Sequence, residues 1–379
     1  MVRSVKASQI AEWHTLKEAV VYTPSVEVAY AQLSPIENLY DDVIKLEVAR
    51  KEHMIFKETL KSEGVKVYEL MDLVNINPAF KNYVKKRIER LYETSNYIAD
   101  LKWLNSLNYI INNYSPETLW LMAILRPELI NVSKEEDMRA RSSLLHIHPL
   151  GNLFYMRDQQ FVTDKGLVMG NLRMPARAGE TEITELGFAS LGIKPVYKMN
   201  SPLEGGDFLP AGNVAFLGRG YRNTNDSVNE LLNSGALGYD TIAVVKQPAN
   251  QETMHLDTYF NILGPTLVVG DRDILKNSDC TLYKKENSGY TKVETLKFYA
   301  FLKKKGFEVL ELDLKKERFG TNFLTLNERK ILMPVNYKLR GTVKLYEKAG
   351  VEVVPIKVNE LLAGYGGVHC MTCALRREK

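Results

Sequence analysis

Cysteine is scarce in this sequence, which is 379 residues long and contains three cysteines, Cys280, Cys370 and Cys373. Such an odd and sparse set cannot supply the disulfide framework of a small secreted domain. The first residues, Met1 to Lys6, lack an apolar signal core. The sequence also lacks an uninterrupted apolar run of about 18 residues, which a membrane-spanning helix needs. We therefore expect a cytoplasmic protein with no membrane as a partner.

A strong excess of either charge is also lacking. The chain has 50 Lys and Arg residues against 46 Asp and Glu residues, which gives a formal net charge of +4. So small an imbalance gives no reason to expect nucleic acid as a partner. The hydrophobic fraction of 45% and the charged fraction of 25% are ordinary for a globular protein. Composition leaves open whether the chain forms a homo-oligomer.

Glycine is absent from Phe80 through Lys134, where apolar residues recur at helical spacing. Within this stretch Ser115, Pro116 and Glu117 form a helix-start signal. The serine hydroxyl can cap the helix, the proline needs no N–H at the first position, and the acid interacts favourably with the positive helix end. The stretch predicts an all-helical insertion over residues 80–140.

Short apolar runs and helical stripes alternate in the rest of the chain. Residues 17–22, 41–62 and 65–70 predict a strand, a helix and a strand. The polar segment 284–292 is expected to be a surface loop. No clear sequence repeat and no low-complexity linker divides the chain. We therefore predict one α/β catalytic domain over residues 1–379, with the insertion inside it. Further strands are expected at residues 166–169, 214–217, 241–245 and 266–269.

Two of the three thiols lie in the segment from Gly366 to Cys373. Cys370 follows two glycines and His369, and a thiolate is a strong nucleophile near neutral pH. The alternative is a buried structural thiol, which most free cysteines are. Cys370 and Cys373 form a Cys-x-x-Cys pair, but no second such pair and no histidine pair at zinc-finger spacing occurs. Neither a metal site nor a redox dithiol is therefore predicted.

Carboxylates occur in two further segments. Glu204 and Asp207 flank two glycines, which let the backbone turn tightly so that both acids can converge, although a simple turn has the same pattern. His255 and Asp257 are two residues apart and would share one face of a strand. The alternative is a half-buried histidine beside a surface acid. A thiol, an imidazole and several carboxylates are suited to attack on the carbon of a guanidinium or amidinium group.

Three arginines adjoin these segments or turns between strands. Arg157 precedes Asp158, and this pair alone predicts a structural ion pair. Arg177 and Arg222 each follow a turn, and taken alone such arginines are expected to be solvated.

Taken in order, these segments resemble arginine deiminase, a member of the guanidino-modifying superfamily that includes amidinotransferases and dimethylarginine hydrolases. The resemblance spans nearly the whole chain. It implies a five-bladed α/β propeller of repeated strand–helix modules, with the site in a central cavity and a helical insertion. The matching segments are residues 39–42, 49–53, 152–158, 175–177, 204–207, 218–222, 255–258 and 366–373.

The resemblance implies a role for each matching side chain at the guanidinium end of an arginine substrate. It makes Cys370 the nucleophile and His255 the general acid and base. Glu204 would pair with the guanidinium, while Asp158 and Asp257 would grip its two edges. Planar carboxylates and guanidinium groups match in a bidentate manner, which supports this assignment.

At the other end of the substrate, the resemblance implies that Arg177 and Arg222 bind the α-carboxylate and that Asn152 contacts the polar head. The implied reaction is hydrolysis of L-arginine to L-citrulline and ammonia through a covalent amidino-cysteine intermediate. No metal and no organic cofactor is implied.

Two positions differ from many deiminases. His369 stands where an arginine often precedes the nucleophile, and Tyr365 stands where a basic residue is common. The ending from Gly366 to Cys373 is similar to that of amidinotransferases. Transfer of the amidino group to an amine is therefore an alternative reaction, and a non-catalytic arginine sensor with the same pocket is an alternative of another class.

Overall fold

A computed structural model describes residues 5–94, 101–131, 143–287 and 289–379. Within these ranges strands and helices alternate along most of the chain, which confirms the predicted mixed α/β class. No helix in them is both long enough and apolar enough to cross a membrane.

One kind of three-stranded unit recurs five times in the described residues. A middle strand pairs antiparallel with one neighbour and parallel with another, which follows it after a helix. The middle strands are β1 (Thr15–Val21), β6 (Leu167–Met169), β9 (Val214–Arg219), β12 (Leu267–Asp271) and β17 (Lys330–Pro334). Their antiparallel partners are, in the same order, β19 (Cys373–Glu378), β5 (Gln160–Val162), β8 (Phe208–Ala211), β11 (Phe260–Gly264) and β16 (Leu324–Asn327). Their parallel partners are β2 (Lys66–Glu69), β7 (Tyr197–Lys198), β10 (Thr241–Lys246), β15 (Glu308–Leu312) and β18 (Glu352–Ile356).

Helices connect the parallel strands of each unit. Parallel strands cannot be joined by a tight hairpin, so each pair needs a crossover connection. The connecting helices are α1 (Val26–Ala31) and α2 (Leu46–Ser62), α7 (Glu180–Ser190), α8 (Asn225–Asn233), α9 (Arg272–Asn277) and α10 (Phe298–Lys304), and α11 (Arg340–Lys348). The helix predicted for residues 41–62 thus begins at Leu46.

Continuous apolar runs place the strands in the interior. All but the last residue of β9 and of β10 is buried, as expected for parallel strands that are covered on both faces. The first unit is completed from the far end of the chain, because β1 pairs antiparallel with β19 and Thr15 lies opposite Glu378. The unit thus joins the two ends of the described chain.

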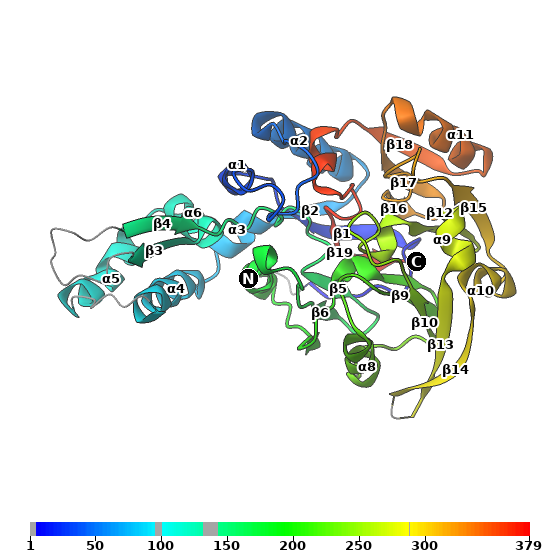
Figure 1. Cartoon of the computed structure of the whole chain (residues 1–379), viewed down its shortest axis with the longest axis horizontal. Coiled ribbons are helices and arrows are strands. Elements are labelled where there is room, and N and C mark those ends of the chain that lie inside the picture. The colour runs from blue at the N-terminus through cyan, green and yellow to red at the C-terminus, as the bar shows by residue number, and fades with distance from the viewer. Residues whose placement is uncertain (1–4, 95–100, 132–142, 288) are drawn as a thin grey trace.

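The insertion projects from one side of the body (Figure 1). After α3 (Leu70–Asn75) it contains α4 (Phe80–Thr94), α5 (Leu101–Asn113) and α6 (Pro116–Leu125), and the hydroxyl of Ser115 caps α6 as predicted. The prediction that it is all-helical is wrong, because β3 (Pro127–Asn131) and β4 (Ser143–Ile147) form an antiparallel pair. The helix α6 ends at Leu125, because the next residue, Arg126, has a φ of +51° and Pro127 cannot extend the helix. Parts of the predicted insertion, residues 95–100 and 132–140, lie outside the described residues.

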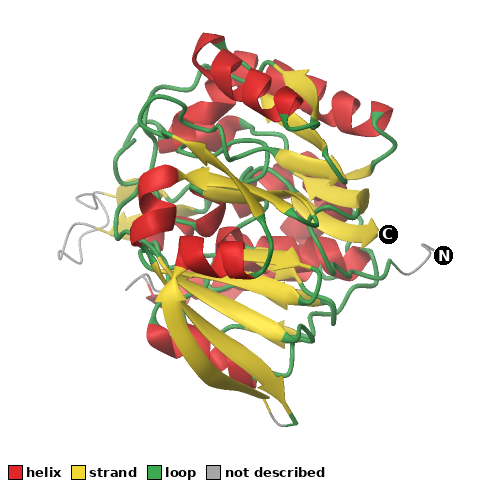
Figure 2. Cartoon of the chain, turned by 90° about the vertical axis from the view of Figure 1, so that its right-hand side faces the viewer, coloured by secondary structure: helices red, strands yellow, loops and turns green. Residues whose placement is uncertain are grey.

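The prediction of a surface loop over residues 284–292 is also wrong. This segment lies mostly in a long hairpin of β13 (Asp279–Glu286) and β14 (Gly289–Lys297), which extends the sheet of β8, β9 and β10 at the β10 edge (Figures 1 and 2). Many of the hairpin's side chains are exposed or half-buried, so its sequence lacks the apolar run of a core strand. The polar sequence of this segment therefore gave no signal for its two strands.

Candidate active site

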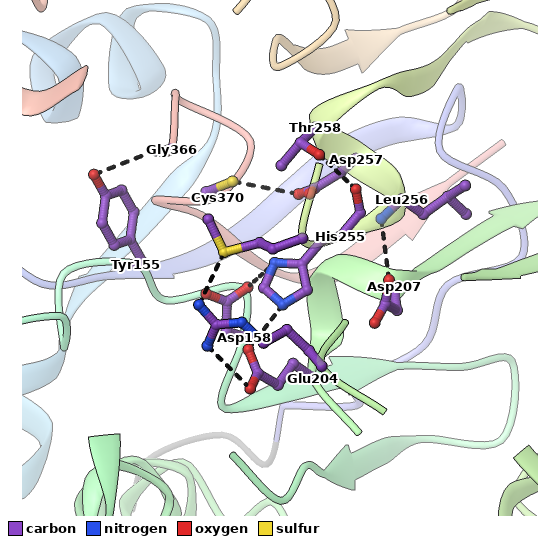
Figure 3. Close-up of polar contacts among 12 residues, drawn as sticks. Tyr155, Asp158, Glu204, Asp207, His255, Leu256, Asp257, Thr258, Gly366 and Cys370 are labelled. Atoms are coloured by element: carbon purple, nitrogen blue, oxygen red, sulfur yellow. Dashed lines mark hydrogen bonds and ion pairs between the residues drawn. The ribbon is translucent and has the colours of Figure 1, made fainter. Parts of the chain in front are cut away.

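The eight predicted site residues come together in the structure, and all of them are buried. Six of them line one pocket. These are Asn152, Asp158, Arg177, Arg222, His255 and Cys370. The other two, Glu204 and Asp257, contact the lining residues directly (Figure 3).

Short turns between strands hold these side chains. Glu204 immediately precedes a 3-10 turn, η2 (Gly205–Asp207), which leads into β8. Gly205 is required in this turn, because a Cβ there would collide with the backbone carbonyl oxygens of Arg157 and Gln160. Gly206 is packed against the ring of His255. The two glycines therefore allow the backbone contacts that bring Glu204 to the imidazole.

The two acids of this turn do not converge as predicted. Asp207 points away from Glu204 and accepts hydrogen bonds from the side chains of Gln247 and Asn223 and from the backbone N–H of Leu256. It therefore anchors the neighbouring turn, η3 (Leu256–Thr258). The acid that faces the pocket is Glu204.

His255 and Asp257 do not lie in a strand, so the prediction that they share one face of a strand is wrong. His255 is the residue before η3, and Asp257 is inside it. The hydroxyl of Thr258 donates a hydrogen bond to the carbonyl of His255 at 2.6 Å. The turn directs His255 toward Glu204 and Asp257 toward Cys370 (Figure 3).

The imidazole of His255 lies between two carboxylates. Its Nε2 is 2.8 Å from Oε2 of Glu204, and its Nδ1 is 3.5 Å from Oδ1 of Asp158. Burial alone would lower the pKa of His255, but these two acids raise it to about 9. Burial would raise the pKa of Glu204, but the hydrogen bond with His255 and the nearby Arg222 lower it to about 2. The pair is therefore an imidazolium and a carboxylate at neutral pH.

The thiol of Cys370 lies in an environment that opposes its ionisation. Its Sγ is 3.5 Å from Oδ2 of Asp257. Burial, reinforced by the negative charges of Asp257 and Asp158, raises the pKa of Cys370 well above its usual range. A positively charged ligand in the pocket would offset these charges and favour the thiolate.

Asn322 is a site residue that the sequence did not reveal. Its Nδ2 is 3.0 Å from Sγ of Cys370, and it approaches the pocket from the turn before β16. A single asparagine after glycine and threonine matches no chemical motif. Its position depends on how two distant units pack, so only the structure places it against the sulfur.

A second layer of buried charges supports Asp257. Nδ1 of His369 is 2.7 Å from Oδ2 of Asp257 and lowers the pKa of that carboxyl group against the effect of burial. Behind it, Nε2 of His369 is 3.9 Å from Glu12, which also pairs with Arg157 and Arg377. The predicted pairing of Arg157 with Asp158 is therefore wrong, because the partner of Arg157 is Glu12.

Neither Arg177 nor Arg222 is solvated, so the expectation drawn from each arginine alone is wrong. Arg177 pairs with Asp158 at 2.6 Å and with Glu180 at 2.8 Å. Arg222 lies 3.5 Å from Glu204 and donates to Oε1 of Gln251 at 3.0 Å. Both guanidinium groups thus face the pocket with partners already in contact.

One group of potential metal ligands occurs within the described ranges. Asp158, Glu204 and His255 each place one ligand atom within 4.8 Å of the others. Their mutual ion pairs, and those with Arg177 and Arg222, account for this arrangement without an ion.

Comparison with known proteins identifies relatives of the whole chain. A family model described as arginine deiminase matches residues 37–377. An arginine deiminase of Halobacterium salinarum is 25% identical, with 99% of this chain and 97% of the relative covered. An arginine deiminase of Borrelia garinii subsp. bavariensis is 27% identical, with 96% of each chain covered.

Solved structures share the fold at lower sequence identity. A DDAH from Pseudomonas aeruginosa complexed with citrulline has a TM-score of 0.56 at 13% identity, with 95% of this chain and 99% of that chain covered. An inosamine-phosphate amidinotransferase from Streptomyces griseus has a TM-score of 0.57 at 15% identity, with 100% of this chain and 98% of that chain covered. At these identities the likeness concerns the fold.

The contacts of Gly205 predict that Gly205→Ala destabilises the protein. We expect the free energy of unfolding to fall by about 1–3 kcal/mol, because the added methyl group meets two rigid backbone carbonyls. Urea denaturation measures this change. The control is Gly341→Ala in α11, where the nearest atom is 3.7 Å away and alanine should stabilise the helix by about 0.5–1 kcal/mol. Equal stabilities for the two variants would contradict the crowding seen at Gly205.

The carboxylates around His255 predict an unusually basic imidazole. In a titration followed by NMR, His255 should lose its proton near pH 9. Glu204→Gln should lower this midpoint by about 1–2 pH units, because the closest negative charge is removed. Glu47→Gln, which changes an exposed acid on α2, is the control and should leave it unchanged. A midpoint near that of a free histidine in the unaltered protein would refute the ion pair.

Proposed function

Since the chain belongs to the arginine deiminase family, we propose that it hydrolyses free L-arginine to L-citrulline and ammonia through a covalent amidino-cysteine intermediate. One observation carries the proposal: the thiol of Cys370, the Asp257 carboxylate and the His255–Glu204 pair meet at one buried pocket. A thiol surrounded by acids suits a cationic electrophile, because the substrate charge compensates for the acids.

The guanidinium of arginine would be held by Asp158 and Asp257. Oδ1 of each accepts no hydrogen bond from the residues that the structure describes, although both carboxylates are buried. Buried polar atoms without a hydrogen bond are unfavourable, so these oxygens are suited to accept the N–H groups of a guanidinium. Glu204 would pair with the same group from beside His255.

The substrate head would be bound by Asn152, Arg177 and Arg222. Nε and Nη1 of Arg222 donate no hydrogen bond to the described residues, although Nη1 lies 3.5 Å from Glu204, and both are suited to a carboxylate. Arg177 is paired with Asp158 in this structure, and an arriving guanidinium would compete for that acid. Binding of the two ends of arginine would then be coupled through Arg177.

The proposed reaction has two covalent steps. Substrate binding favours loss of the Cys370 proton to solvent, and the thiolate forms a bond to the guanidinium carbon. The imidazolium of His255 gives its proton to the departing nitrogen, which leaves as ammonia, and an amidino–thioether remains. Neutral His255 then takes a proton from water as the hydroxide adds to the carbon. Collapse breaks the carbon–sulfur bond, releases citrulline and one proton, and restores the thiolate.

We also propose that the five strand–helix units are the blades of a five-bladed α/β propeller, with the pocket at its centre and residues 1–379 forming one catalytic domain. The repeated strand order and the pairing of β1 with β19 support a closed ring. The insertion then lies outside the ring as a subdomain. The sparse, free cysteines support a place in the cytoplasm.

An amidinotransferase is the second candidate. The ending Gly366 to Cys373 favours it, since His369 directly precedes the nucleophile there. Both reactions share the first covalent step, and only the second differs, with an amine in place of water. A non-catalytic arginine sensor is less well supported, because binding alone needs no thiol beside the guanidinium site.

The products separate these candidates. Purified protein supplied with arginine alone should release citrulline and ammonia in equal amounts over many turnovers, because water completes the reaction. Product analysis with and without glycine or lysine measures this. Ornithine that forms only with an added amine, with negligible citrulline, would replace hydrolysis by transfer. Binding of arginine without any product would leave the sensor.

The two neighbouring thiols should behave differently. Cys370→Ala should reduce turnover by about 10³-fold or more, because the covalent route is lost. Cys373→Ala is the matched control and should keep substantial activity, since Cys373 lies buried in β19 and burial raises its pKa to about 12. Initial rates of ammonia release measure both. A greater loss in Cys373→Ala would move the nucleophile to that residue.

A further inference from the structure

We propose that Asn322 is a catalytic residue that stabilises the thiolate of Cys370 by donating a hydrogen bond to its sulfur. Nδ2 of Asn322 lies 3.0 Å from Sγ of Cys370, within the range of an N–H to sulfur bond. Asn322 is buried, with 1% of its surface exposed, so water does not compete for this bond. The assignment rests on the proposed role of Cys370 as the nucleophile.

The neighbours of Asn322 fix which end of its amide faces the sulfur. Oδ1 accepts hydrogen bonds from the backbone N–H groups of Gly367 and Cys370, at 2.9 and 3.3 Å. Nδ2 also donates to the backbone carbonyl of Asp257 at 3.1 Å. Exchanging the amide oxygen and nitrogen would set donors against donors and an acceptor against an acceptor. The group beside Sγ is therefore the N–H donor.

An N–H donor at this position offsets the electrostatic effects that oppose the thiolate of Cys370. Burial and the negative charges of Asp257 and Asp158 oppose the thiolate. Among the side chains that the structure describes, Asn322 donates a hydrogen bond to this sulfur. The amide is neutral, so it supports the thiolate without a positive charge that would repel a guanidinium.

Asn322 is itself held rigidly. Asn261, which lies in β11, donates hydrogen bonds to the backbone carbonyls of Thr321 and Phe323, at 2.8 and 2.9 Å. The residues on both sides of Asn322 are thereby fixed to the neighbouring sheet. A donor fixed before the reaction begins needs no reorganisation as charge develops on sulfur.

Asn322 can act at both ends of the covalent sequence. Before attack, its N–H stabilises the sulfur after the thiol proton has left for solvent. When the carbon–sulfur bond breaks, the electron pair returns to the same sulfur, and the same N–H stabilises it again. The amide exchanges no proton in either step, so the proton balance of the reaction is unchanged.

Alkylation of Cys370 tests the inference without requiring turnover. Iodoacetamide reacts with the thiolate, and mass spectrometry of the Cys370 peptide gives the rate at each pH. Asn322→Asp keeps an oxygen for the N–H groups of Gly367 and Cys370 but replaces the donor. Asn322→Ala removes the whole amide. The control Asn77→Asp changes a buried amide with the same kind of backbone contacts outside the site.

We expect alkylation near neutral pH to slow by roughly threefold to tenfold in Asn322→Ala. The thiolate fraction should fall by about 10- to 100-fold, and the greater basicity of the sulfur partly compensates. Asn322→Asp should be slower still, because its charge faces the sulfur, and its rate profile should move to higher pH. Asn77→Asp should match the unaltered protein.

Three outcomes determine whether Asn322 stabilises the thiolate of Cys370. A rate and pH profile for Asn322→Asp equal to those of the unaltered protein would overturn the inference. A faster reaction in Asn322→Ala with no change in Asn322→Asp would also overturn it, because it would show that Asn322 only holds the loop closed. Slowed alkylation in Asn322→Asp supports the inference even if arginine yields no product, which would instead refute the proposed function. If Asn322→Ala does not fold, Asn322→Asp still decides.

Discussion

The mutual compensation of buried charges is the constraint on which this site depends. Three carboxylates, those of Asp158, Glu204 and Asp257, are almost wholly removed from water. Asp158 and Glu204 are each in contact with a cation, Arg177 and His255 respectively, and Asp257 lies 2.7 Å from the imidazole of His369. Removing one member of a buried pair leaves an uncompensated charge, which typically costs about 3–5 kcal/mol. The loops that carry these residues are therefore held in place by the charges as well as by packing.

The compensation of buried charges also extends beyond the pocket. Glu12 holds Arg157 and Arg377 and lies near His369, so a segment before β1 and the strand β19 share one buried network. His369 links this network to Asp257, and Asp257 lies beside the sulfur. The ionisation of Asp257, the acid beside Cys370, is thus set partly by residues from the two ends of the described chain. A change at Glu12 would therefore alter the electrostatic environment of Asp257 without contacting it.

The sequence predicted the elements whose signals are local. Apolar runs identified strands such as β9 and β10, and the cap at Ser115 identified the start of α6. The strands β3 and β4 were missed because the absence of glycine suits a strand as well as a helix. The hairpin of β13 and β14 was missed because its exposed strands carry no apolar run. In each case the deciding contact lies between segments, and a single segment does not record it.

The residues of the candidate site likewise divide into those with a recognisable local sequence signal and those without one. The ordered segments containing Glu204, His255 and Cys370 were sufficient to predict one pocket, since their residue types share a chemical purpose. Asn322 and Glu12 were not predicted, because an isolated asparagine or glutamate forms no recognisable sequence motif. Their roles follow from the side chains that they contact in the folded protein. Arg157 was given the wrong partner because adjacency in sequence does not place two side chains on the same side of the backbone.

The pairing of β1 with β19 has a consequence for biosynthesis. Cys370 lies three residues before β19, and among the described strands β19 is the last to be translated. Its partner β1 is made more than three hundred residues earlier, as the pairing of Thr15 with Glu378 shows. Contacts of such large sequence separation form late in folding. A nascent chain therefore carries the acids and the imidazole of the candidate site before it carries the thiol, and the candidate site is assembled by the same event that completes the first sheet.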